Sequence, residues 1–351
     1  MASSSMQPGT TENKPILTPV RTLEGHQSWK YSLQDSDEFS HISCISYFPD
    51  GKQMISRSRD KTIRRWDLRE GKEIEEAREV CGNGIDAVGG RWVVSAGYTL
   101  GLKVSEVETG IVRTFYIGSI RYIDISTDSA LVAGGSYDGT ARIWSLDTGK
   151  LVAGPFKTGD GPITSVRLSE DSRKLAVSSN WRQNLQVWDV QAQKLLVRKS
   201  TPTKPWSELP VFWTTKDKSI VAASSFTDDF MVTTIYEFDA STLEIVGAPF
   251  EHTDDIRSLA LSSDCVLLAI SSAYTIGLWA FEFRQLLASF DVSGFPRTLV
   301  FSPASRQLAY TTLGDAKIYI CNIPANILAS IELKEPQPNV CIPHIHPSFI
   351  C

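Results

Sequence analysis

The 351-residue sequence lacks the features of membrane-inserted, exported or nucleic-acid-binding proteins. It has no run of about 18 apolar residues, the length that a membrane-spanning helix needs. Its first 15 residues are polar and contain no apolar core of the kind found in secretory signals. The 35 Lys and Arg are outnumbered by 40 Asp and Glu, which argues against nucleic acid as a partner. We therefore expect a protein of the cytoplasm or nucleus without membrane insertion.

The sequence also lacks recognisable metal-binding and catalytic motifs. Its six cysteines include no CxxC pair, so their spacing predicts neither a disulfide framework nor a zinc site. It contains no GxSxG, no phosphate-binding GxxxxGK[ST], no HExxH and no dinucleotide-binding glycine run. His344 and His346 form an HxH pair, but a metal site needs further ligands in fixed geometry. We expect a protein that is not an enzyme and holds no metal or cofactor.

A strand-and-turn unit instead recurs along the whole chain. Four copies end an apolar segment in Trp and continue into a polar turn: TIRRWDLREGK (62–72), ARIWSLDTGK (141–150), LQVWDVQAQK (185–194) and TIGLWAFEFRQ (275–285). Weaker copies occupy 102–110, 234–242 and 317–326. The positions equivalent to Trp are 66, 105, 144, 188, 236, 279 and 321, at intervals between 39 and 48 residues. This spacing is typical of a repeat architecture.

Each unit contains signals for three further strands. Upstream of the Trp, segments such as ISCISYFPDGKQMISRSRDKT (42–62) alternate apolar and polar residues around turn residues, which indicates a β-hairpin. Downstream, segments such as KLLVRKS (194–200) and LLASFDV (286–292) supply a fourth strand. Four strands in about 40–45 residues are the signature of one propeller blade. The sequence therefore predicts an all-β, seven-bladed propeller of four-stranded antiparallel blades.

Four segments carry a family resemblance: LEGH (23–26), FPDG (48–51), SRSRDKTIRRWD (56–67) and GSYDGTARIW (135–144). With them the chain resembles the WD40 repeat family between residues 20 and 333. The resemblance implies a structural hydrogen-bonded brace in blade one, formed by His26, Ser56, Asp60 and Trp66. We expect three regions: a disordered segment at 1–15, the propeller at 16–333 and an irregular tail at 334–351.

Two segments compete for the outer strand of the last blade. The resemblance assigns this place to ILTPVRTLEG (16–25), whereas ILASIEL (327–333) follows Cys321 at the spacing of outer strands elsewhere. Both cannot occupy one position in a sheet. We favour the N-terminal strand, which leaves 327–333 as a fifth strand or as a segment lying on a face.

The loops entering the first strand of each blade and the turns between its second and third strands share one rim. Tyr, Trp and Arg dominate the energetics of protein interfaces because they combine large buried area with a polar group. The long loop 26–41 adds Trp29 and Tyr31. We expect a protein-binding face that includes Arg57, Arg59, Lys61, Tyr98, Tyr137, Trp181, Arg182, Trp206, Phe230 and Tyr274. The sequence thus favours a non-catalytic scaffold for proteins or peptides whose identity it does not specify.

Three alternatives remain open. Residues 54–69 resemble the box of propellers that act as substrate receptors of cullin-4 ubiquitin ligases, with Asp67 and Arg69 as adaptor-binding candidates and Arg57 and Arg65 as departures. Arg57 and Arg59 could instead bind a phosphate group through charge-assisted hydrogen bonds. A propeller enzyme would need a deep pocket with convergent titratable groups.

Overall fold

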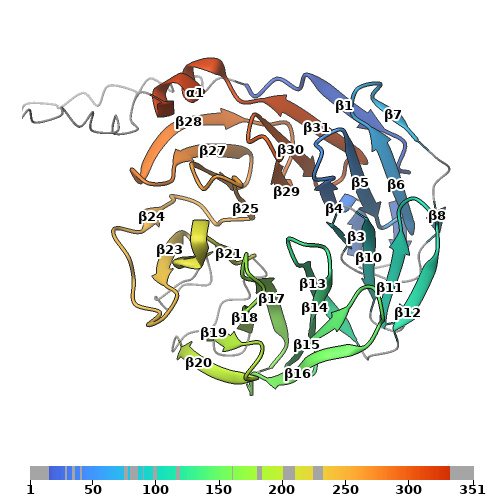
Figure 1. Cartoon of the computed structure of the whole chain (residues 1–351). Coiled ribbons are helices and arrows are strands. Elements are labelled where there is room, and N and C mark those ends of the chain that lie inside the picture. Colours follow the sequence, from blue (N-terminus) through green and yellow to red (C-terminus); the bar gives the residue numbers. More distant parts are fainter. Residues whose placement is uncertain are drawn as a thin grey trace, which may run out of the picture.

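A computed structural model of the chain describes residues 16–27, 30–33, 36–39, 42–74, 78–79, 86–89, 91–97, 101–115, 119–159, 161–179, 184–200, 210–223 and 232–332. In these residues seven small antiparallel sheets stand side by side in a ring (Figure 1). The predicted seven-bladed propeller is confirmed.

Each of the first four blades places its strands in chain order within one sheet, with the first strand nearest the centre of the ring (Figure 1). Blade one contains β4 (Ile42–Tyr47), β5 (Gln53–Ser58), β6 (Thr62–Asp67) and β7 (Lys72–Glu73), and β8 (Arg78–Glu79) also pairs with β6. Blade two contains β9 (Asp86–Gly89), β10 (Trp92–Gly97), β11 (Gly101–Glu106) and β12 (Val112–Phe115). Blade three contains β13 (Ile120–Ile125), β14 (Leu131–Ser136), β15 (Thr140–Ser145) and β16 (Leu151–Lys157). Blade four contains β17 (Ile163–Leu168), β18 (Lys174–Ser179), β19 (Asn184–Asp189) and β20 (Lys194–Lys199).

The remaining blades follow the same order, with blade five the least regular. Blade five contains β21 (Phe212–Trp213), the 3-10 turn η1 (Thr215–Asp217), β22 (Ser219–Ala223), β23 (Thr234–Asp239) and β24 (Phe250–Glu251). Blade six contains β25 (Ser258–Leu261), β26 (Leu267–Ser271), β27 (Thr275–Ala280) and β28 (Gln285–Asp291). Blade seven contains β29 (Pro296–Phe301), β30 (Gln307–Thr312), β31 (Lys317–Asn322) and β1 (Arg21–Glu24).

The repeat phase inferred from the sequence is confirmed because every position equivalent to Trp lies in the third strand of its blade. Trp66 pairs in register with Met54, and both are buried. They share an apolar cluster with Leu23 and Ile318, which come from blade seven. Such clusters combine residues of neighbouring blades, so burial between blades holds the ring together.

The N-terminal strand closes the ring. β1 pairs antiparallel with β31, with Leu23 opposite Ile318, and so completes blade seven as its outer strand. Of the two alternatives left for 327–333, the fifth strand is excluded, because residues 325–332 form α1 (Ala325–Glu332). Ile327 and Ile331 are one helical turn apart and pack against the apolar cluster of blades six and seven. With the outer position of the sheet occupied, a helix lets this segment satisfy its own backbone and still bury one apolar face.

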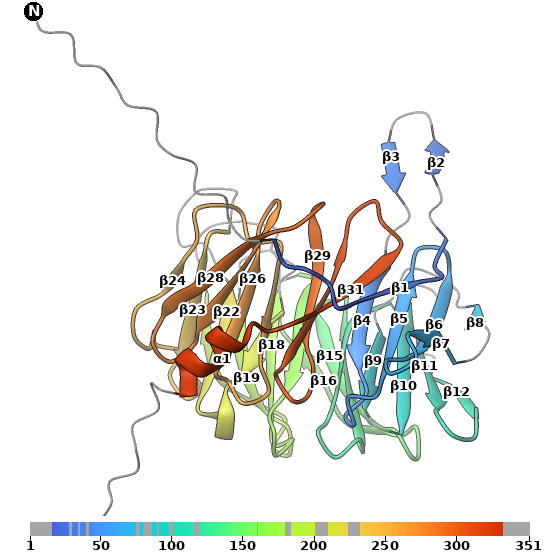
Figure 2. The same cartoon turned by 90° about the horizontal axis from the view of Figure 1, so that it is seen from above.

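Two faces of the ring follow from this topology. We use the name hairpin face for the rim formed by the loops entering each first strand and the turns between second and third strands. The opposite rim carries the turns between first and second and between third and fourth strands. Between β1 and β4, the strands β2 (Lys30–Leu33) and β3 (Ser36–Phe39) form a two-stranded hairpin that projects from the hairpin face (Figure 2).

None of the helices in the described part of the chain has the length and apolar character needed to cross a membrane. The expectations for residues 1–15 and 334–351 fall outside the described residues and stay predictions.

Candidate functional site

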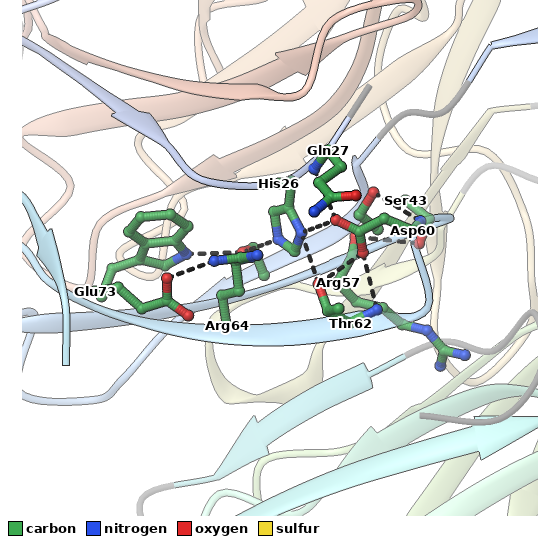
Figure 3. A network of polar contacts seen from close by, with 11 residues as sticks. His26, Gln27, Ser43, Arg57, Asp60, Thr62, Arg64 and Glu73 are labelled. Atoms are coloured by element: carbon green, nitrogen blue, oxygen red, sulfur yellow. Dashed lines mark hydrogen bonds and ion pairs between the residues drawn. The ribbon is translucent and has the colours of Figure 1, made fainter. Parts of the chain in front are cut away.

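Four side chains from three segments of blade one form a continuous hydrogen-bonded chain under the hairpin face. The Trp66 indole N–H donates to Ser56 Oγ at 2.7 Å, and Ser56 Oγ lies 2.7 Å from His26 Nε2. His26 Nδ1 lies 2.9 Å from Asp60 Oδ2 (Figure 3). Because the indole can only donate, Ser56 donates to Nε2, and Nδ1–H then donates to the carboxylate. The structure thus brings together all four residues that the sequence places in the brace.

The Asp60 carboxylate fixes the turn between β5 and β6. It accepts the Gln27 amide at 2.9 Å and the Thr62 hydroxyl at 2.6 Å in addition to His26. Burial raises the pKa of Asp60, but the hydrogen bonds from His26, Thr62 and the Gln27 amide outweigh burial and lower it to about 2. His26, Ser56 and Trp66 are buried, so their polar groups form hydrogen bonds within the protein and are not exposed on the hairpin face.

Arg57 does not lie on the hairpin face, and its predicted exposure is wrong. Its exposed fraction is 2%, and its Nη1 donates to the backbone carbonyl of Ala96 in blade two at 3.4 Å. Arg57 is still within β5, where it pairs with Ile63, and β5 is covered by the neighbouring blade. The turn that follows is different, because Arg59 and Lys61 are exposed there.

Two of the predicted aromatic residues are exposed on the hairpin face. The exposed fraction is 56% for Tyr137, after β14, and 53% for Tyr274, before β27. They belong to blades three and six, so the structure does not bring them together. Tyr98, Trp181, Arg182, Trp206, Phe230 and Trp29 lie outside the described residues, as does the side chain of Tyr31.

The structure adds two residues to this face that the sequence analysis did not single out. Phe295, in the loop between β28 and β29, packs against Tyr274 in a tilted arrangement with ring centroids 4.4 Å apart. Leu313 follows β30, and its amide donates to the Phe295 carbonyl at 2.8 Å. Both side chains are 40% exposed. The segment Gly294-Phe295-Pro296 could have indicated this position. Gly and Pro on either side of Phe295 are typical of a loop, and an aromatic residue in a loop is a candidate for surface exposure.

The two adaptor-binding candidates, Asp67 and Arg69, lie on the opposite rim and differ in their contacts and exposure. Asp67 Oδ1 accepts the amides of Arg69 and Glu70 at 2.8 and 2.9 Å, and these bonds lower the pKa of Asp67. Arg69 projects from the same turn with 92% of its side chain exposed. Asp67 therefore shapes the turn, and Arg69 is the residue available at its surface.

Other blades replace the brace with different polar groups. In blade four the Trp188 indole donates to Gln186 Oε1 at 2.9 Å, and Gln186 Nε2 donates to the Thr158 carbonyl at 3.0 Å. In blade six the buried Trp279 indole N–H has no hydrogen-bond partner in the described residues. His252 instead accepts the Asp254 amide at 3.2 Å.

Across the described ranges, from 16–27 to 232–332, no three His, Cys, Asp or Glu side chains gather in a way that could hold a metal ion. His344 and His346 lie outside those ranges.

The ring of seven four-stranded sheets and the brace of blade one define a β-propeller built from WD-type repeats. The model of the WD domain, G-beta repeat, matches residues 17–67 and 111–145. These matches are to the WD40 repeat family, and the seven-bladed ring agrees with that similarity.

Curated relatives match at low identity. The guanine nucleotide-binding protein subunit beta of Arabidopsis thaliana is 26% identical over 198 residues, which cover 51% of this chain and 49% of the relative. The small ribosomal subunit protein RACK1 of Caenorhabditis elegans is 25% identical over 51% of this chain and 66% of its own length. Autophagy-related protein 16 of Arabidopsis thaliana is 28% identical over 37% of this chain and 26% of its own length. The chain thus spans about a quarter to two thirds of the length of these relatives.

Proposed function

We propose that this propeller is a non-catalytic scaffold of the cytoplasm or nucleus that binds proteins or peptides through its hairpin face. One observation carries the proposal: this face exposes Tyr137, Tyr274, Phe295 and Leu313, and the last three lie on adjoining loops. Backbone hydrogen bonds from the Val292 amide to Tyr274 and from the Leu313 amide to Phe295 preform this surface, which limits the entropy lost on binding. The similarity to WD-repeat proteins supports the proposal at the level of the family.

Affinity purification of the full chain from its native cells, followed by mass spectrometry, tests this function. A variant carrying Arg59→Ala, Tyr137→Ala and Tyr274→Ala should lose partner proteins that the wild type retains. Leu196→Ala, an equally exposed apolar residue on the outer strand of blade four, is the matched control and should retain them. Identical partner sets for all three proteins would contradict the proposal.

The exposure of Arg69 favours a second candidate function, that of a substrate receptor for a cullin-4 ubiquitin ligase. The guanidinium projects from the rim opposite the hairpin face, so adaptor and substrate would occupy different faces. Arg69→Ala should abolish co-purification of the ligase adaptor while the melting temperature stays unchanged. Arg173→Ala, which removes an arginine side chain with 85% exposure on the same rim in blade four, is the control. Equal adaptor recovery from wild type and Arg69→Ala would exclude this role.

A further inference from the structure

Three exposed large side chains of blades six and seven lie on adjoining loops of the hairpin face. The rings of Tyr274 and Phe295 contact each other in a tilted arrangement, with 4.4 Å between centroids and 39° between planes, and Leu313 is joined to Phe295 by a backbone hydrogen bond. We name these three residues the Tyr274 cluster. By contrast, Tyr137 occupies the corresponding turn of blade three and has a similar exposure, but the described residues place no aromatic ring against it.

The backbone beneath the Tyr274 cluster is fixed. The Val292 amide donates to the Tyr274 carbonyl at 2.8 Å, which ties the loop after β28 to the turn before β27. Gly294 has a φ of +123°, and a Cβ placed there would lie 3.2 Å from Thr312 Cβ. Only glycine adopts this conformation and permits this approach without strain. The cluster is therefore preorganised, and a ligand that covers it would not have to order the loops.

The charges around the Tyr274 cluster are predominantly acidic. The same loops and turns carry Glu251, Asp254, Asp255, Asp291 and Asp315 against Arg257, Arg297 and Lys317. Arg257 pairs with Asp255 at 3.3 Å, so these two charges offset each other. Lys317 pairs with Glu24 at 2.8 Å, and Arg297 also has an interaction within the chain.

One carboxylate remains available beside the cluster. Asp291 lies opposite Thr275, the residue after Tyr274, and is exposed. It forms no ion pair within the described part of the chain. An apolar surface flanked by an unpaired carboxylate favours a ligand that combines an apolar group with positive charge.

From this arrangement we infer that the Tyr274 cluster docks a short partner peptide through an aromatic or long aliphatic side chain flanked by Lys or Arg. This inference rests on the proposed function and assigns it to one part of the face. The aromatic pair supplies the contact area, and Asp291 supplies charge complementarity. Binding should therefore weaken with rising ionic strength.

A peptide display experiment on the full-length protein tests the inference. A phage library of random decapeptides should yield enriched sequences that contain Phe, Tyr, Trp, Leu or Met next to Lys or Arg. The most enriched peptide, made synthetically and labelled for fluorescence polarisation, should lose at least tenfold in affinity on Tyr274→Ala and on Phe295→Ala. Asp291→Asn should weaken it several-fold, whereas Tyr274→Phe should retain binding.

Tyr137→Ala is the matched control and should bind the peptide like the wild type. Enrichment of acidic or purely polar sequences, or the absence of enrichment, would overturn the inference. If binding falls on Tyr137→Ala or Arg59→Ala but not on Tyr274→Ala, this docking site is wrong while the proposed function stands. If Phe295→Ala does not fold, Tyr274→Ala decides the matter, because its exposed side chain can be removed without leaving a core cavity.

Discussion

Individual residues of the brace show how one buried carboxylate can stabilise this fold. Asp60 accepts hydrogen bonds from His26, Thr62 and the Gln27 amide, and its side chain is almost fully covered. Its negative charge is therefore favoured in the folded protein more than in the unfolded chain. The folded-state pKa of about 2 compares with an ordinary value of 3.8. The ionised group should add about 2 kcal/mol to the free energy of unfolding at neutral pH.

A pH series of urea unfolding measurements checks this value. Because the folded pKa is lowered, the contribution is complete above about pH 4 and declines as pH falls towards 2. Asp60→Asn should be less stable than wild type at pH 7, and the difference should shrink steadily below pH 4. Asp254→Asn, at an exposed position, is the control. A difference between wild type and Asp60→Asn that does not change with pH would contradict this account.

Turn residues provide a second prediction at this scale. The turn between the first two strands of blade one places Gly51 at a φ of +67°, and the equivalent turn of blade four places Ser172 at +58°. A side chain at positive φ is strained, and glycine is not. Ser172→Gly should raise the free energy of unfolding by about 0.5–1 kcal/mol, and Gly51→Ala should lower it by about 1 kcal/mol. Chemical denaturation measures both, and a destabilised Ser172→Gly would contradict the argument.

At the scale of elements, α1 packs against blades six and seven. Ile327 is buried among apolar residues of blades six and seven, whereas Asn326 is exposed on the same helix. Ile327→Ala should lower the free energy of unfolding by about 2–4 kcal/mol, because it removes buried methylene groups and leaves a cavity. Asn326→Ala should change it by less than about 0.5 kcal/mol. Equal effects of the two substitutions would show that the helix does not pack as described.

The segment that forms α1 shows where the periodicity of apolar residues does not distinguish a strand from a helix. Residues 327–333 follow Cys321 at the spacing of an outer strand, and Ile327 and Ile331 also fit a helix. Such a short segment cannot be assigned by periodicity alone. Its conformation was decided by β1, which already occupies the outer edge of β31.

At the scale of the whole molecule, an ion pair that we call the clamp joins blades five and six. Arg284, after β27 of blade six, pairs with Glu237 of blade five, and its guanidinium lies 4.6 Å from the ring centroid of Phe250. Both charged side chains are largely buried. Glu237 also accepts a hydrogen bond from Ser219, so the clamp connects three strands of blade five to blade six.

A double-mutant cycle tests this clamp. Arg284→Met should lower the free energy of unfolding by about 3 kcal/mol, because it leaves the Glu237 carboxylate buried without its partner. Glu237→Gln combined with Arg284→Met should recover part of that loss, since no unpaired charge remains. Thermal and urea unfolding of the four proteins give the coupling energy. Strictly additive effects would mean that the pair does not couple the two blades.

The number of blades, the phase of the repeat and the brace of blade one were determined by the sequence itself. These features depend on local patterns: alternating apolar residues, turn residues at fixed offsets, and the His26, Ser56, Asp60 and Trp66 spacing of the family. Local patterns persist in the fold because, apart from β1 and β8, each strand pairs with an immediate neighbour in the chain. Periodicity along one segment is enough to detect them.

Only the tertiary structure decided which terminal segment closes the ring, that Arg57 is buried against blade two, and that Phe295 and Leu313 join Tyr274 at the surface. Each of these outcomes depends on contacts between different blades or distant segments. The exposure of a rim side chain is set by the neighbour that covers it, and a single sequence does not record that neighbour.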